Sequence, residues 1–186
     1  MRNLLIRFLG LAALLAAPTL ASAVHAQDVR AAFFANLRDL CGARFEGAKT
    51  FPADTTDAFH GQLLVAEVAS CSDSVMRVPF IVGKDRSRTW VFRRGANTLQ
   101  LQHDHRLKDG APDPVNLYGG MATATGSARS QSFPADAHTA ELIPAAVTNV
   151  WTVSLSADGQ RLTYHLERDG RPRFTAELRR VTLPAR

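Results

Sequence analysis

The chain has 186 residues, of which 46% are hydrophobic, 21% charged and 8% aromatic, and its formal net charge is +5. These values are ordinary for a globular protein and exclude a disordered, collagen-like, coiled-coil or disulfide-scaffold chain. They also favour a single domain, because a chain of this length supports one hydrophobic core.

The first 26 residues have the layout of a secretory signal peptide. Two arginines precede an apolar run at 8–17, and small residues follow up to Ala23 and Ala26. This order of basic, apolar and small residues is typical of a segment that is cleaved during export. We expect cleavage after Ala26, with Ala23 as the alternative, and a single mature domain at 27–186. The sequence therefore predicts a periplasmic or secreted protein with no later transmembrane helix.

The basic excess does not indicate a nucleic-acid partner. Removal of residues 1–26 lowers the net charge from +5 to +3. The remaining basic residues are spread along the chain, and Arg93-Arg94 and Arg179-Arg180 are its only adjacent pairs. A nucleic-acid interface needs a clustered basic face with interleaved aromatic residues. We predict no nucleic-acid binding, and the oligomeric state stays open.

Cys41 and Cys71 are the two cysteines of the chain, and both lie in the part predicted to be exported. In an oxidising compartment a single pair is most simply a disulfide. A reactive thiol or a pair of metal ligands is the alternative. We predict the disulfide.

An amphipathic helix of about 13 residues is predicted after the signal peptide. Asp28 can cap its start, apolar residues then recur at helical spacing, and Gly42 can end it. Its apolar face comprises Val29, Phe33, Leu37, Leu40 and Cys41.

From residue 62 onward the hydrophobic pattern alternates with period two, and turn-forming residues separate the segments. Asp158-Gly159 and Asp169-Gly170 are strong hairpin signals. The predicted strands are 62–69, 75–82, 89–94, 98–105, 116–123, 127–133, 139–142, 150–156, 161–167 and 173–183. We predict a mainly β fold, in which the helix precedes an antiparallel meander β-barrel of about 8–10 strands. A β-sandwich is the alternative, because strand count alone does not separate the two.

Two histidines on the strand at 98–105 mark the first candidate site. Leu99, Leu101, His103, His105 and Leu107 share the face that we expect to point inward. Two inward imidazoles, two residues apart, can reach one metal ion or one small ligand. The structural alternative is a histidine hydrogen-bonded to the nearby loop carboxylate of Asp109.

Neighbouring segments add aromatic and cationic residues to this candidate site. Arg88 and Trp90 share one strand face, so the guanidinium can lie over the indole or pair with an anionic group. Tyr118 precedes two glycines that allow close backbone approach. The predicted ligand-binding residues are His103, His105, Arg88, Trp90 and Tyr118. Trp151 is predicted to lie in the core.

The spacing of His103, His105 and Asp109 resembles the first metal-binding motif of cupins. That resemblance implies a divalent metal held by these three residues and a metal-dependent enzyme. Asp109 stands where the motif has Glu, and no second motif follows. No nucleophile elbow or Gly-rich phosphate loop is present, so no catalytic residue and no cofactor is otherwise predicted.

Several segments together resemble a group of secreted proteobacterial proteins to which no activity is assigned. They are Leu40-Cys41-Gly42, Phe45-Glu46-Gly47, 85–90, 103–106, Asp109-Gly110, Tyr118-Gly119-Gly120 and 133–136. The resemblance implies a periplasmic or secreted protein. A helix followed by a meandering barrel is also similar to the shape of lipocalins and other calycins, although the Gly-x-Trp signature of lipocalins is missing.

These observations favour an exported protein that binds a small ligand or acts as an accessory protein, rather than an enzyme. The metal-dependent enzyme at His103 and His105 is the alternative. An envelope protein that works through its surface is a third hypothesis.

Overall fold

A computed structural model describes residues 19–53 and 55–182. Most of the predicted signal peptide, residues 1–18, lies outside the described residues. The helical segments are α1 (Thr19–Arg38), α2 (Ala137–Leu142) and the 3-10 turn η1 (Pro144–Ala146). The strands are β1 (Arg44–Phe51), β2 (Leu64–Glu67), β3 (Ser70–Cys71), β4 (Val75–Val82), β5 (Asp85–Arg94), β6 (Leu99–His105), β7 (Tyr118–Met121), β8 (Ser130–Pro134), β9 (Val150–Leu155), β10 (Arg161–Arg168) and β11 (Arg171–Val181).

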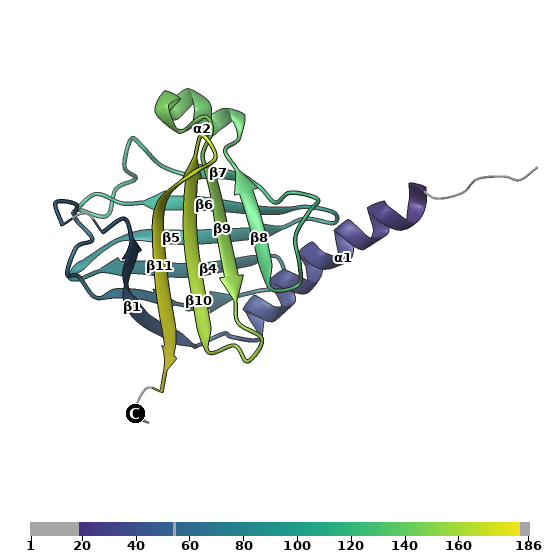
Figure 1. The fold of residues 1–186 in the computed structure, drawn as a ribbon, viewed down its shortest axis with the longest axis horizontal. Helices are drawn as coiled ribbons and strands as arrows, with labels where there is room; N and C mark the ends of the chain where they lie inside the picture. Colours follow the sequence, from purple (N-terminus) through teal and green to yellow (C-terminus); the bar gives the residue numbers. More distant parts are fainter. Residues whose placement is uncertain (1–18, 54, 183–186) are drawn as a thin grey trace, which may run out of the picture.

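The strands form one antiparallel sheet that curls into a nearly closed barrel, which confirms the predicted fold class. The strand order is β7-β6-β5-β4-β2-β1-β11-β10-β9-β8, and the short β3 pairs with β4. Two meanders, from β1 to β7 and from β8 to β11, are joined by the pairing of β1 with β11. Figure 1 shows β8 to β11 running steeply across the front, while β4 to β6 cross behind them at a large angle.

The barrel closes where β7 meets β8, and a buried threonine completes this seam. The amide of Gly119 donates to the hydroxyl of Thr139 at 2.7 Å, and that hydroxyl donates to the carbonyl of Gly119 at 2.8 Å. The amide of Asp136 donates to the same carbonyl at 2.9 Å. A Cβ atom at Gly119 would lie 1.9 Å from the carbonyl oxygen of Leu101, and one at Gly120 would lie 1.7 Å from that of Pro134. The glycine pair therefore provides the close approach that the sequence predicts.

Helix α1 closes one end of the barrel. Phe33, Phe34 and Leu37 are at most 1% exposed, and the ring centroid of Phe33 lies 6.3 Å from that of Phe92 on β5. Each such side chain contributes about 1.5–3 kcal/mol through burial. In the part of the chain that the structure describes, no helix is both long and apolar enough to cross a membrane.

The bounds of α1 differ from the prediction. The helix begins at Thr19, not at Asp28, and residues 19–27 include three alanines and no glycine or proline that would interrupt a helix. It ends at Arg38, and a turn leads to Gly42, whose φ of 81° requires the left-handed conformation that glycine adopts. Gly42 therefore belongs to the turn after the helix and does not itself end the helix, contrary to the prediction.

Two strand predictions need correction. The segment 139–142 is part of α2, because the Asp136 side chain accepts a hydrogen bond from the amide of Thr139 at 2.8 Å and caps a helix there. Strand β1 was not predicted. It pairs with β11 through a close contact at Gly47, where a Cβ atom would lie 2.0 Å from the carbonyl oxygen of Glu177.

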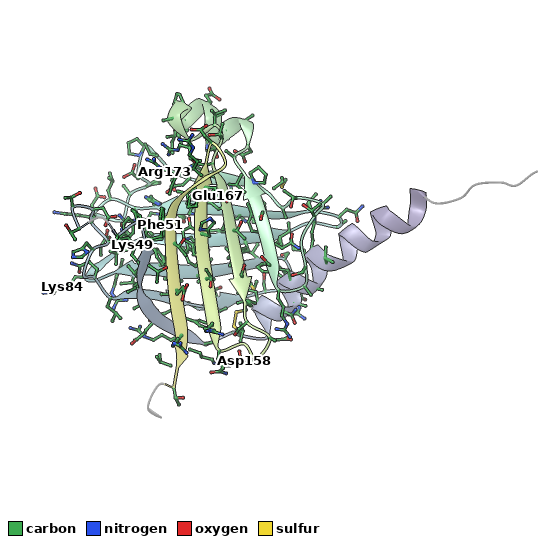
Figure 2. All side chains as sticks on the ribbon, in the orientation of Figure 1. Lys49, Phe51, Lys84, Asp158, Glu167 and Arg173 are labelled. Carbon is green, nitrogen blue, oxygen red and sulfur yellow. A yellow bond between two sulfur atoms is a disulfide. The ribbon has the colours of Figure 1, made fainter. Side chains whose placement is uncertain are left out.

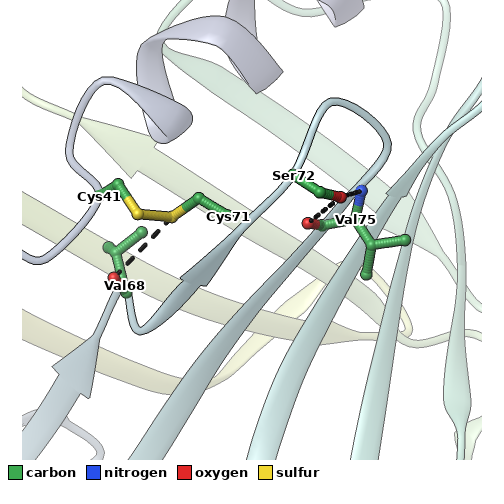
Figure 3. The surroundings of a disulfide bond; sticks show 5 residues. All are labelled: Cys41, Val68, Cys71, Ser72 and Val75. Carbon is green, nitrogen blue, oxygen red and sulfur yellow. Dashed lines mark hydrogen bonds between the residues drawn. A yellow bond between two sulfur atoms is a disulfide. The ribbon is translucent and has the colours of Figure 1, made fainter.

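The predicted disulfide joins Cys41 to Cys71, with an S–S distance of 2.08 Å (Figure 3). It ties the chain just after α1 to β3. Beyond Cys71, the hydroxyl of Ser72 accepts from the amide of Val75 at 2.9 Å and donates to its carbonyl at 3.0 Å, which closes the β3–β4 turn. The disulfide thus connects the helix that closes the barrel to the sheet.

The two ends of the barrel differ in the elements that cover them. The β9–β10 turn lies at the end closed by α1, where a Cβ atom at Gly159 would lie 3.4 Å from the Leu40 side chain. The β4–β5 turn and the loop before β2 lie at the other end. Figure 2 labels Asp158 in the first of these turns and Lys84 in the second, on well-separated edges of the barrel. We call the end without α1 the open end.

Candidate functional site

A cavity of about 270 Å³ occupies the open end of the barrel. Its volume is close to the lower limit of about 300 Å³ for small-molecule sites. Seven aromatic residues other than histidine come from six strands and from the loop before β2, and Ile143 and Ala146, at the two ends of the η1 region, cover one side. The lining comprises Phe59, Phe80, Arg88, Thr89, Trp90, His103, His105, Tyr118, Ile143, Ala146, Asn149, Trp151, Tyr164, Leu166, Arg168 and Phe174.

Stacked aromatic rings form the floor of the cavity. The Trp90 indole stacks against both Phe80 and Tyr164, with centroid distances of 4.6 Å and 4.5 Å and interplanar angles of 19° and 26°. His103 stacks on Tyr118 at 4.7 Å. Their inward direction follows from the alternation of strand residues, because Trp90 and His103 are opposite each other in the β5–β6 register. The floor is therefore a surface of packed rings that is largely aromatic.

His103 is 4% exposed and is held by two hydrogen bonds. Its Nδ1 lies 3.1 Å from the carbonyl oxygen of Tyr118, and its Nε2 lies 2.7 Å from the hydroxyl of Tyr164. Because a carbonyl can only accept, Nδ1 carries the proton, and Nε2 accepts from the Tyr164 hydroxyl. Burial lowers the pKa of His103 to about 3 and raises that of Tyr164 well above its usual value. Both groups are neutral at pH 7.

His105 and Tyr118 form a second polar pair, nearer the rim. The Tyr118 hydroxyl lies 3.0 Å from Nε2 of His105. Burial, followed by the nearby charge of Arg88, lowers the pKa of His105. Burial raises the pKa of Tyr118 to about 12. This pair can donate or accept a hydrogen bond without a net charge.

The structure brings all five predicted ligand-binding residues to this one cavity, but Arg88 is placed differently than expected. Its guanidinium lies 5.8 Å from the ring centroid of Phe59, not over the indole of Trp90, and it forms an ion pair with Asp85. Trp90 instead packs against the rings of Phe80 and Tyr164. The pairing with a carboxylate was the alternative stated for Arg88.

Leu107 and Asp109 lie outside the site. Leu107 is 44% exposed, since the inward alternation ends with β6 at His105. The Asp109 carboxylate accepts from the amide of Ala111 at 2.9 Å and shapes its own loop. The histidines find tyrosine partners instead of the loop carboxylate that we expected.

The set of metal ligands implied by the cupin resemblance is not assembled. Among residues 19–53 and 55–182, no three His, Cys, Asp or Glu side chains gather in a way that could hold a metal ion. Both ring nitrogens of His103 are engaged, and Asp109 is turned to its own loop. Cys41 and Cys71 form the disulfide and are not metal ligands.

Several lining residues were not predicted as site residues. Tyr164 lies on β10, 61 residues from its partner His103. Asn149 and Arg168 come from the two strand ends beside it, and Phe59 comes from the loop before β2. Trp151 is 2% exposed, as predicted for a core residue, and also lines the cavity. Alternation places Tyr164 inward, but only the barrel brings these distant segments together.

The low pKa of His103 predicts acid destabilisation. The unfolded chain binds a proton near pH 6.5 and the folded one only near pH 3, so this contribution is complete above pH 6.5 and is lost as the pH falls toward 3. We expect His103 alone to lower the free energy of unfolding by about 2 kcal/mol between pH 7 and pH 5. Urea unfolding at both pH values measures this difference. The matched variant His103→Gln should show a smaller difference, and equal differences in the two proteins would contradict the prediction.

The cavity is the site that the fold offers for function: an aromatic floor, two neutral His–Tyr pairs and two guanidinium groups in one lining. Comparison with protein-family models, with curated proteins and with solved structures finds no match to the chain, so a function has to be inferred from the cavity itself.

Proposed function

We propose that this is an exported protein that binds one small, largely apolar molecule in the cavity at the open end of its barrel. The observation that carries the proposal is the cavity of about 270 Å³ whose lining includes both tryptophans of the chain. An aromatic surface of this kind gains free energy when an apolar ligand displaces water from it.

The export part of the proposal is supported by two features. The first 26 residues have the order of a signal peptide. The disulfide between Cys41 and Cys71 is compatible with an oxidising compartment. Recovery of the chain from the cytosol with residues 1–26 intact and both thiols reduced would contradict this part.

Ligand binding is tested with the neutral apolar dye N-phenyl-1-naphthylamine. We expect one dye molecule to bind per chain, with increased dye emission and energy transfer from tryptophan, because both Trp90 and Trp151 line the cavity. No saturable binding by this dye or by the phenylbutyl compounds described below would overturn the proposal.

A matched pair of variants locates the bound dye. Ile143 is half-buried and lines the cavity, whereas the nearby Val147 is 57% exposed and does not line it. We expect Ile143→Trp to fill part of the cavity and weaken dye binding by about tenfold or more. Val147→Trp should leave the affinity unchanged. Equal affinities in the two variants would place the dye elsewhere.

A further inference from the structure

The charged groups in the cavity lining are all of one sign. Of its sixteen residues, Arg88 and Arg168 are the charged ones, and no carboxylate is among them. His103 and His105 are neutral at pH 7, because burial lowers the pKa of each. The lining therefore provides cationic and neutral hydrogen-bonding groups but no anionic one.

Arg168 is held in place by a buried side chain. Its Nε donates to the Oδ1 of Asn149 at 2.8 Å, and Asn149 is 4% exposed. Across the described ranges, 19–53 and 55–182, no carboxylate forms an ion pair with Arg168. The guanidinium is thus fixed at one edge and keeps its terminal N–H groups for another acceptor.

Arg88 differs from Arg168 in this respect. It is paired with Asp85, whose carboxylate also accepts from the amide of Ser87 at 2.9 Å. Arg88 therefore brings its own counterion to the rim of the cavity, whereas Arg168 does not. Of the two arginines, Arg168 is the one that lacks a carboxylate partner among the described residues.

A half-buried guanidinium beside an apolar surface attracts an anion more strongly than one in water, because the local dielectric is lower. A guanidinium also matches the planar, two-oxygen geometry of a carboxylate. The aromatic floor, where Trp90 stacks against Phe80 and Tyr164, accommodates the apolar part of the same molecule.

We propose that the ligand of this cavity is a small amphipathic anion, whose apolar body lies on the aromatic floor and whose carboxylate or similar acidic group binds Arg168. This inference rests on the proposed function, because it names the chemical class of the molecule that the same cavity binds. Asn149 acts as a positioning residue for the guanidinium.

Three compounds with one apolar body test the proposal: 4-phenylbutyrate, 4-phenylbutanol and 4-phenylbutylamine. Binding is followed by the emission of Trp90 and Trp151 under selective tryptophan excitation, where the phenyl group does not absorb. We expect the carboxylate to bind about ten- to hundredfold more tightly than the alcohol, and the amine to bind most weakly. Binding of the alcohol equal to or tighter than that of the carboxylate would overturn the inference and leave the proposed function standing.

Two variants in the β10–β11 hairpin test whether Arg168 causes the preference for the carboxylate over the alcohol. We expect Arg168→Gln to abolish the preference for the carboxylate while the affinity for the alcohol changes by less than about twofold. Arg171→Gln removes the same charge from the exposed first residue of β11, outside the lining, and should keep the preference. Equal preferences in the two variants would overturn the role of Arg168.

A second substitution at the same position tests the role of Arg168 even if Arg168→Gln does not fold. Arg168→Lys keeps the positive charge, and we expect it to retain part of the preference, because an ammonium group offers no fixed two-point geometry. Circular dichroism shows whether each variant is folded. If Arg168→Gln does not fold, a full preference in the folded lysine variant contradicts the two-point geometry, and its complete loss contradicts the charge contribution.

Discussion

We expect replacement of Cys41 and Cys71 by alanine to lower the free energy of unfolding by about 3.5–4 kcal/mol. The two residues are 30 positions apart, and their disulfide closes a loop of that size in the unfolded chain. Removing it raises the conformational entropy of the unfolded state, which favours unfolding. Urea unfolding of the oxidised protein and of the double variant measures the difference. Alanine is preferred to serine as the substitute, because a serine hydroxyl would be buried where Cys71 packs against the core.

The reduced wild-type protein is the matched control for this prediction. Reduction opens the same loop without changing the sequence, so its unfolding midpoint should coincide with that of the double variant. A double variant within about 1 kcal/mol of the oxidised protein would contradict the prediction. It would mean that α1 holds its position without the covalent link to β3.

The second large effect is expected for Leu37→Ala in α1. Leu37 is 1% exposed and belongs to the core at the closed end of the barrel. Truncating such a side chain removes its burial and leaves a cavity, which typically costs about 2–5 kcal/mol. Thermal and urea unfolding followed by circular dichroism measure the loss.

The same truncation at Leu107 is the control. Leu107 is 44% exposed, and surface substitutions usually change stability by about 0.5 kcal/mol or less. Equal losses at Leu37 and Leu107 would contradict the position of α1 as the cover of the barrel.

The sequence predicts the fold well where local signals are strong. Asp158-Gly159 and Asp169-Gly170 mark the two hairpins that join β9, β10 and β11. Strand β1 lacks such a signal, because Gly47 is required for its close contact with β11 and interrupts the apolar alternation. Helix α2 has only six residues, too few for a helical period to stand out, and its start depends on one capping side chain, Asp136.

The site was also predictable in part, namely where the signal lies within one strand of the sequence. Alternation along β6 and β5 identifies His103, His105, Arg88 and Trp90 as neighbours on inward faces. The partner of His103 cannot be read from its surroundings in sequence, because Tyr164 reaches it only through closure of the sheet. Asp109 was expected as a partner because it is a carboxylate close by in sequence. The structure uses the hydroxyl of Tyr164 across the barrel and that of Tyr118 on the adjacent strand β7.

The position of α1 also bears on how the precursor is processed. Helix α1 runs from Thr19 to Arg38, and the cleavage site that we propose, after Ala26, falls within it. Every α1 residue that the structure places in the core, namely Phe33, Phe34 and Leu37, lies on the downstream side of that site. Removal of the leader would therefore shorten the helix and leave these three residues in place at the end of the barrel that α1 covers.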